Sequence, residues 1–157
     1  MVDAVSICAI GLGQLNAKLE VRAFGSYQWL AKGFYENECF GIAGIAGEDS
    51  GGTDMTPAIE YCRIALLGRQ EKDKLLIIMT DGYPANQEEA AREVHLAKQV
   101  GIHVLGVLFD NYSEKRDFTD PAMAKLFGPN GFTVIHSLDQ FPREVGQGIK
   151  SIIRKRT

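Results

Sequence analysis

Long apolar runs, a basic charge excess and a signal peptide are all missing from this sequence. No stretch approaches the roughly 20 apolar residues that a membrane-spanning helix needs, and the amino-terminal residues lack the charged and apolar segments of a signal peptide. The formal net charge is -3, which offers no basic field to a nucleic-acid backbone. These absences predict a cytoplasmic protein that uses neither membrane nor nucleic acid as a partner.

Cysteines are few, and the common catalytic signatures are absent. The three cysteines, Cys8, Cys39 and Cys62, lie far apart in apolar sequence, which favours buried free thiols over disulfides or a zinc motif. The sequence contains no Gly-x-Ser-x-Gly elbow, no Gly-x-x-x-x-Gly-Lys phosphate loop and no Asp-x-Asp pair. We therefore expect a protein that is not an enzyme.

The sequence does contain enough apolar residues for one core. Hydrophobic residues make up 45% of its 157 residues, which predicts a single domain over 1–157. Helices are expected over 2–16, 56–66, 86–100, 122–127 and 141–152, and strands over 19–26, 75–80, 103–109 and 132–136, with 27–34 pairing beside 19–26 and mostly loop over 35–52. This alternation predicts an α/β, Rossmann-like fold with an open, mostly parallel sheet and helices on both faces.

Helix boundaries can also be read from the sequence. Thr56 before Pro57 is typical of a helix start, with the threonine as the cap and proline at the first position. Asn86 with Glu89 resembles a capping box, and Gly101 supplies the stop of the same helix.

Two loops at strand ends carry the residue types of a metal site. In an open α/β sheet, ligands collect at the carboxyl ends of the strands. Thr53 lies in a glycine-rich loop before a helix, and Asp81 directly follows the apolar run 75–80. A hydroxyl and a carboxylate are hard oxygen ligands suited to Mg²⁺ or Mn²⁺. Thr53 and Asp81 are therefore the candidate metal ligands.

A plainer interpretation of the same residues stays open. Asp-Gly is a common turn pair, and Thr53 can simply cap a helix. Asp110 after the strand 103–109 is typical of a turn with Asn111, although it can also line the same edge. The possible site-lining residues are Gly51, Gly52, Asp54, Gly82 and Asp110.

The combination and order of these loops resemble the von Willebrand factor A family. Gly-Gly-Thr-Asp-Met-Thr-Pro-Ala at 51–58 precedes a helix, and Leu-Leu-Ile-Ile-Met-Thr-Asp-Gly follows at 75–82. In that family a metal-ion-dependent adhesion site takes an Asp-x-Ser-x-Ser loop after the first strand, a threonine from a second loop and an aspartate from a third. Thr53 and Asp81 match the last two, so the resemblance implies a Mg²⁺ or Mn²⁺ site.

The resemblance departs from the family at the amino-terminal end. No Asp-x-Ser-x-Ser occurs in the sequence, and residues 2–16 resemble the helix that follows that loop. We expect an amino-terminally incomplete domain that lacks the first, central strand, and weak metal binding with only Thr53 and Asp81 in place. The sheet then either keeps a gap beside 75–80 or closes by pairing 75–80 with 19–26.

The residues 51–58 are most similar to the corresponding residues of an intracellular group of the family. That group includes the accessory subunit of the aerobic cobalt chelatase and proteins that act beside AAA+ ATPases. The resemblance implies a non-catalytic module that captures an acidic residue of a protein partner through Mg²⁺ and couples it to an AAA+ ATPase. The alternatives are a degenerate scaffold without metal and, less favoured by the motifs, a metal-assisted hydrolase that uses Asp81.

Overall fold

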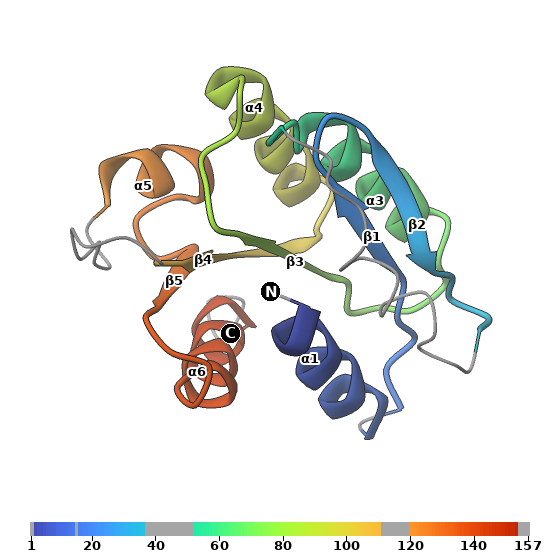
Figure 1. The fold of residues 1–157 in the computed structure, drawn as a ribbon. Helices are drawn as coiled ribbons and strands as arrows, with labels where there is room; N and C mark the ends of the chain where they lie inside the picture. The colour runs from blue at the N-terminus through green and yellow to red at the C-terminus, as the bar shows by residue number, and fades with distance from the viewer. Residues whose placement is uncertain (1, 15, 37–51, 111–119, 154–157) are drawn as a thin grey trace.

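A computed structural model describes residues 2–14, 16–36, 52–110 and 120–153, and it has the layered form of an α/β protein (Figure 1). Its helices are α1 (Val2–Gln14), α3 (Thr56–Leu67), α4 (Gln87–Gln99), α5 (Pro121–Phe127) and α6 (Phe141–Ile153). Its strands are β1 (Val21–Phe24), β2 (Gln28–Lys32), β3 (Leu75–Thr80), β4 (His103–Phe109) and β5 (Phe132–Ile135). The predicted alternation of helices and strands is confirmed, and most of the expected loop 35–52 lies outside the described residues.

The strands form two separate sheets rather than one. β3, β4 and β5 form a parallel sheet in that order, with Leu75 opposite His103 at the start of the β3 and β4 pairing. β1 and β2 form an antiparallel hairpin beside it, and within the described residues β1 does not pair with β3. The sequence left open whether 75–80 would face a gap or pair with 19–26. Among the described residues, the structure has the gap.

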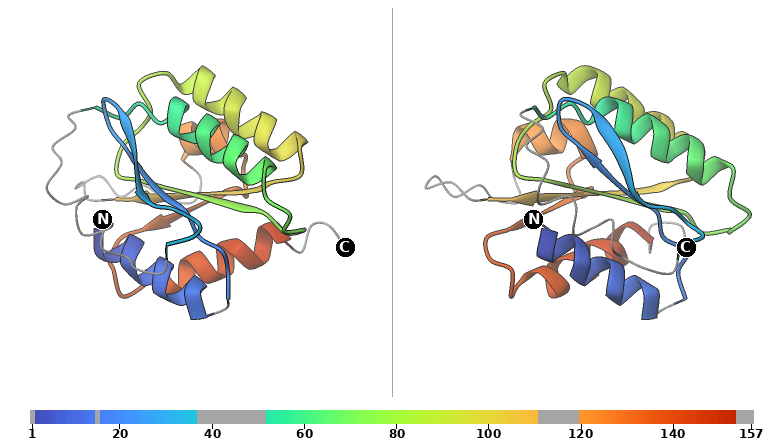
Figure 2. Two further views of the ribbon diagram at one scale, coloured as in Figure 1. Left: turned by 90° about the vertical axis from the view of Figure 1, so that its right-hand side faces the viewer. Right: turned by 45° about the vertical axis from the view of Figure 1, so that its right-hand side comes forward.

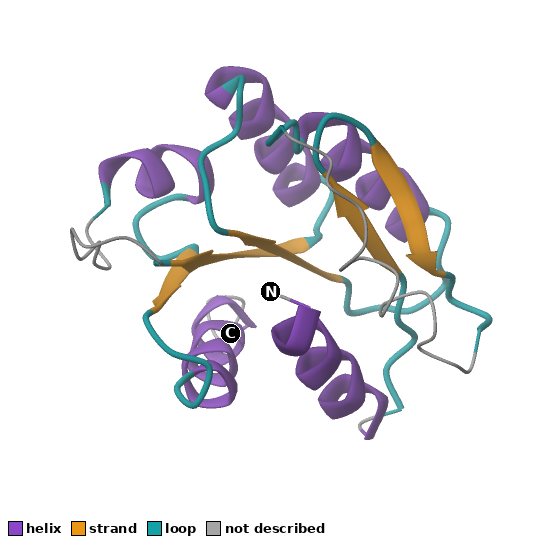
Figure 3. Ribbon diagram, in the orientation of Figure 1, coloured by secondary structure: helices purple, strands orange, loops and turns teal. Residues whose placement is uncertain are grey.

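Helices cover both faces of the three-stranded sheet (Figures 2 and 3). Val104 and Leu108 of β4 point into a core shared with α3, α4 and α5, whereas Leu105 and Val107 point into a second core shared with α1 and α6. Both faces of β4 are therefore buried, which explains its uninterrupted apolar sequence. Within the described residues, each helix is too short or too polar to traverse a lipid bilayer.

Of the two predicted helix caps, one is confirmed and the other is wrong. The Asn86 side chain accepts a hydrogen bond from the Glu89 backbone N–H at 3.2 Å, so the predicted cap of α4 is confirmed. The predicted threonine cap of α3 is wrong, because Thr56 is already the first helical residue and the cap position is occupied by Met55. Met55 is fully buried in the core and makes no side-chain hydrogen bond to the helix.

Asp120 holds the beginning of α5 and connects it to the loop after β3. Its Oδ1 accepts hydrogen bonds from the N–H groups of Ala122 and Met123, and its Oδ2 accepts one from the Tyr83 hydroxyl at 2.5 Å.

We expect Asp120→Ala to lower the free energy of unfolding by about 2 kcal/mol, since a helix cap and a side-chain hydrogen bond are lost together. Urea denaturation measures this change. Asp120→Asn keeps the cap acceptor and should cost less; an equal loss in both variants would contradict the capping role.

Candidate functional site

The loop that carries Thr53 is tied to the ends of both β1 and β3. The Asp54 N–H donates to the carbonyl of Gly25, just after β1, at 2.9 Å, and the Ala85 N–H donates to the carbonyl of Thr53 at 3.0 Å. Because Ala85 lies in the loop after β3, these two bonds bring the carboxyl ends of β1 and β3 to the same edge of the molecule. Thr53 is held between them.

Gly52 allows this close approach. A Cβ atom at Gly52 would lie 2.9 Å from Oγ of Ser26 and 3.3 Å from its backbone nitrogen. A Cβ atom at this position would require the Ser26 side chain to move and its backbone to shift slightly, so a larger residue would disturb the contact between the Thr53 loop and the end of β1. The glycine that the sequence offered as a loop former therefore has a specific role in positioning Thr53.

The turn that carries Asp81 is fixed by a buried threonine hydroxyl. Thr80 is 2% exposed, and its Oγ1 accepts a hydrogen bond from the Gly82 N–H at 3.1 Å while donating one to the Gly82 carbonyl at 2.8 Å. Asp81, between them, is exposed. A Cβ atom on Gly82 would lie 3.6 Å from Oγ1 of Thr53. The structure thus brings Thr53 beside the turn that presents Asp81.

The other candidate residues have different positions. Asp110 follows β4, and its carboxylate, 1% exposed, forms an ion pair with Nδ1 of His136 at 3.2 Å. The backbone N–H of Asp54 donates the hydrogen bond to Gly25 at the end of β1. Gly51 lies outside the described residues. The pairing of Asp110 with His136 could not be predicted from the sequence, because it depends on the alignment of β4 with β5.

Thr53 and Asp81 supply the right kind of ligand but too few of them. An oxygen-only set fits Mg²⁺ or Mn²⁺, which take six oxygen ligands and retain several waters. Among the described residues, no group of three or more His, Cys, Asp or Glu side chains is arranged to hold a metal ion. One carboxylate and one hydroxyl therefore leave most coordination positions to water or to another polypeptide.

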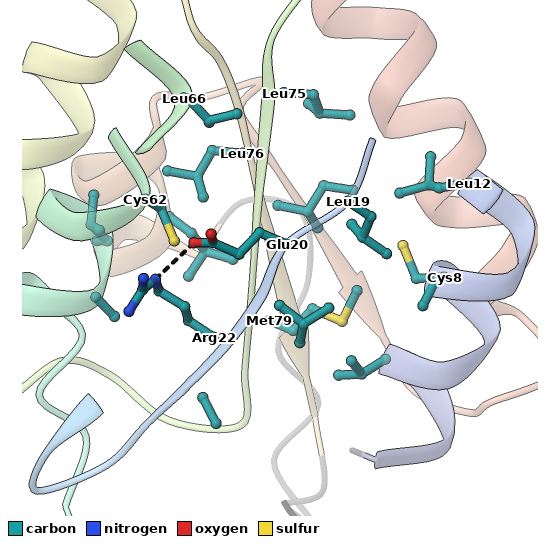
Figure 4. A pocket seen from close by; sticks show the side chains of 18 of the residues that line it. Cys8, Leu12, Leu19, Glu20, Arg22, Cys62, Leu66, Leu75, Leu76 and Met79 are labelled. Atoms are coloured by element: carbon teal, nitrogen blue, oxygen red, sulfur yellow. Dashed lines mark hydrogen bonds and ion pairs between the residues drawn. The ribbon is translucent and has the colours of Figure 1, made fainter. Parts of the chain in front are cut away.

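Thr53 and Asp81 lie at one end of a large cleft. The cleft has a volume of about 660 Å³, follows β3 from Leu75 to Asp81 on one side and follows β1 on the other. Figure 4 shows Cys8 on the side of α1 and Cys62 on the side of α3. Cys8 and Cys62 are free, as expected, but they are only partly buried and lie on the walls of the cleft. Cys39 lies outside the described residues.

The environment of Cys62 suppresses its reactivity. Burial, and to a lesser degree the nearby Glu20 carboxylate, raise the pKa of the thiol from 9.0 to about 11, against a smaller lowering effect of Arg22. Glu20 and Arg22 are themselves paired at 2.8 Å, as the dashed line in Figure 4 shows. Cys62 is therefore a protonated, weakly nucleophilic thiol at neutral pH.

We expect Cys62 to react with iodoacetamide at pH 8 roughly a hundredfold more slowly than an ordinary thiol, because the thiolate is scarcer by that factor. Mass spectrometry of the Cys62 peptide measures the rate, and the urea-unfolded chain provides the reference. The same raised pKa means that the folded state holds this proton between pH 9 and about 11 while the unfolded state releases it, so stability should fall over that range. Equal rates in the folded and unfolded chains would contradict the raised pKa.

Comparison with known proteins establishes the fold. No protein-family model matches the sequence, and no curated protein matches it either. Among solved structures, the chain is similar to the manganese-loaded TRAP protein of Plasmodium vivax, with a TM-score of 0.66 and 16% sequence identity. The similarity covers 84% of this chain and 57% of that chain. Taken with the parallel sheet and its flanking helices, this similarity shows a Rossmann-like fold of the von Willebrand factor A kind.

Proposed function

We propose that this chain is a protein-binding module that depends on a divalent cation. The observation that carries the proposal is the placement of the Thr53 hydroxyl beside the Asp81 turn, at the carboxyl edge of the sheet and at the end of an open cleft. Asp81 would contribute the negative charge and Thr53 a neutral oxygen to Mg²⁺ or Mn²⁺. The cation, when bound, would offer its free positions to a carboxylate of a partner protein.

Two features support this proposal over a catalytic role. The solved structure to which the fold is similar is described as manganese-loaded, which supports a divalent cation as the ligand. The residues around Asp81 hold its turn rigid through Thr80 and Gly82, as a binding site requires. We propose that the module has no catalytic activity of its own.

The finer assignment rests on the sequence alone. The residues 51–58 resemble those of cytoplasmic members of the family that act beside AAA+ ATPases, including the cobalt chelatase accessory subunit. We therefore propose a cytoplasmic protein partner, presented through an acidic side chain, and coupling to an ATPase of this kind. Pull-down with and without EDTA, followed by a screen for ATPase stimulation, tests this assignment separately from metal binding.

The cation site is tested with Mn²⁺ as the probe. We expect the 157-residue chain to bind Mn²⁺ weakly, with a Kd on the order of 1 mM, since only two protein ligands are present. Asp81→Ala should weaken binding at least about tenfold and Thr53→Ala by a smaller factor, as measured by electron paramagnetic resonance of free Mn²⁺. Asp73→Ala is the matched control, because Asp73 is an exposed acid at the opposite end of β3.

Three outcomes would decide against the proposal. Equal Mn²⁺ binding by the Asp81→Ala and Asp73→Ala variants would show that Asp81 is no ligand, and absence of binding in the unmodified chain would favour a scaffold without metal. Turnover of phosphate or ester substrates that is lost in Asp81→Ala would favour a hydrolase.

Asp81→Ala should change the free energy of unfolding by less than about 0.5 kcal/mol, because the side chain is exposed. A loss of several kcal/mol would mean that Asp81 is structural.

A further inference from the structure

A buried carboxylate and a partly exposed histidine meet at the carboxyl edge of the parallel sheet. Asp110 directly follows β4, and His136 directly follows β5. Nδ1 of His136 lies 3.2 Å from Oδ2 of Asp110, and the two side chains are 38% and 1% exposed. A carboxylate this deeply buried costs free energy unless a partner compensates its charge. The pair is therefore a built feature of this edge and not a chance surface contact.

Asp110 fixes the orientation of the imidazole ring. A carboxylate beside Nδ1 of His136 favours a hydrogen atom on that nitrogen, which leaves Nε2 for an external group. A protonated imidazole can donate from Nδ1 to Asp110 and from Nε2 to a second carboxylate at the same time. A ring held in one orientation also loses less conformational entropy when a ligand binds. His136 is therefore suited to bind an anion that approaches from solvent.

The register of the sheet places His136 close to the turn that carries Asp81. Thr80 of β3, Leu108 of β4 and Val134 of β5 are level with one another. Asp81 follows Thr80 directly, and His136 lies two residues beyond Val134, so the two differ in level by one residue. With neighbouring strands about 4.8 Å apart and about 3.3 Å per residue, their backbones are roughly 10 Å apart.

His136 is also the residue at this edge whose chemistry suits an acidic ligand. Of the three residues that directly follow β3, β4 and β5, His136 alone has a side chain that can donate a hydrogen bond to an anion. Asp81 and Asp110 are acids, and the Asp110 carboxylate is almost wholly shielded from solvent. An acidic segment that approaches the edge therefore has two points of attraction, a cation held at Asp81 and the imidazole of His136.

We propose that His136 is a second contact for the partner, and that the partner presents two acidic side chains about 10 Å apart. One carboxylate completes the coordination of the cation, and the other accepts a hydrogen bond from Nε2 of His136. Asp110 is a positioning residue that acts through the histidine. This inference rests on the proposed cation-dependent binding at Thr53 and Asp81, and it adds which class of partner segment is selected and in which orientation.

The test uses the peptide Gly-Asp-Gly-Gly-Gly-Asp-Gly and two derivatives in which one or the other aspartate is asparagine. Four residues of flexible chain span roughly 10–12 Å, which matches the distance between the two contacts. With saturating Mg²⁺, we expect the diacidic peptide to bind the 157-residue chain at least about threefold more tightly than either derivative, as measured by NMR titration. In His136→Gln this advantage of the second aspartate should disappear, since the exposed ion pair that supplies it is lost.

His95→Gln is the matched control. His95 is an exposed histidine in the second half of α4, which leads to the amino end of β4, so its replacement should leave the advantage of the diacidic peptide unchanged. Asp110→Asn tests the positioning role. We expect the ¹⁵N shifts of His136 to show the hydrogen on Nδ1 in the unmodified chain and a loss of this preference in Asp110→Asn, together with a smaller diacidic advantage. Should Asp110→Asn fail to fold, as checked by circular dichroism, His136→Gln and its control decide the matter.

The outcomes separate this inference from the proposed function. Mg²⁺-dependent binding that is equally tight for all three peptides would overturn the second contact and leave the cation site standing. A diacidic advantage that persists in His136→Gln would place the second carboxylate elsewhere on the molecule and would also overturn it. Peptide binding that EDTA leaves unchanged would count against the cation site itself, and with it against contact at two points.

Discussion

Gly131→Ala should lower the free energy of unfolding by at least about 3 kcal/mol and the Tm by roughly 6–12 °C. A Cβ atom at Gly131 would lie 1.9 Å from the carbonyl oxygen of Phe127, where no atom fits. The backbone cannot move away cheaply, because the Gly131 N–H donates to the Gly128 carbonyl and the Gly131 carbonyl accepts from the Gly106 N–H. Relief of the clash therefore costs hydrogen bonds at the start of β5.

The matched control for this substitution is Gly146→Ala. A Cβ atom at Gly146 meets nothing within 4 Å, and the residue lies inside α6, so alanine should raise the free energy of unfolding by up to about 1 kcal/mol. Differential scanning calorimetry of the two variants measures both changes. A Gly131→Ala variant as stable as the unmodified chain would show that the turn between α5 and β5 is not packed as described.

The central strands could be predicted because burial restricts which residue types they contain. β3 and β4 are apolar apart from Thr80 at the end of β3 and His103 at the start of β4, since helices cover both faces of the sheet. The cap of α4 was predictable for a similar reason: the hydrogen bond from Glu89 to Asn86 joins residues three positions apart. Local interactions of this kind can be read from spacing alone.

The parts of the site that escaped prediction depend on contacts between distant residues. The ion pair of Asp110 with His136 exists because β4 and β5 are neighbours, and the bond from Asp54 to Gly25 involves only backbone atoms that any residue possesses. The sequence indicated that β3 would either face a gap or pair with 19–26. In the structure β1 packs on α3 and does not pair with β3, and the Arg22 guanidinium lies 5.1 Å from the centre of the Tyr61 ring.

The backbone hydrogen bonds at the carboxyl ends of β1 and β3 predict that the width of the cleft varies least at that end. Backbone hydrogen bonds to Gly25 and Thr53 hold one end, whereas long side chains such as Glu20 and Arg69 line the other. Side-chain rotamers change far more readily than a hydrogen-bonded backbone, so any widening of the cleft should pivot about the clamped end. The spacing between Thr53 and Asp81 would then stay nearly constant while the distance between the amino ends of the two strands varies, which makes the geometry of the oxygen ligands insensitive to whatever enters between the strands.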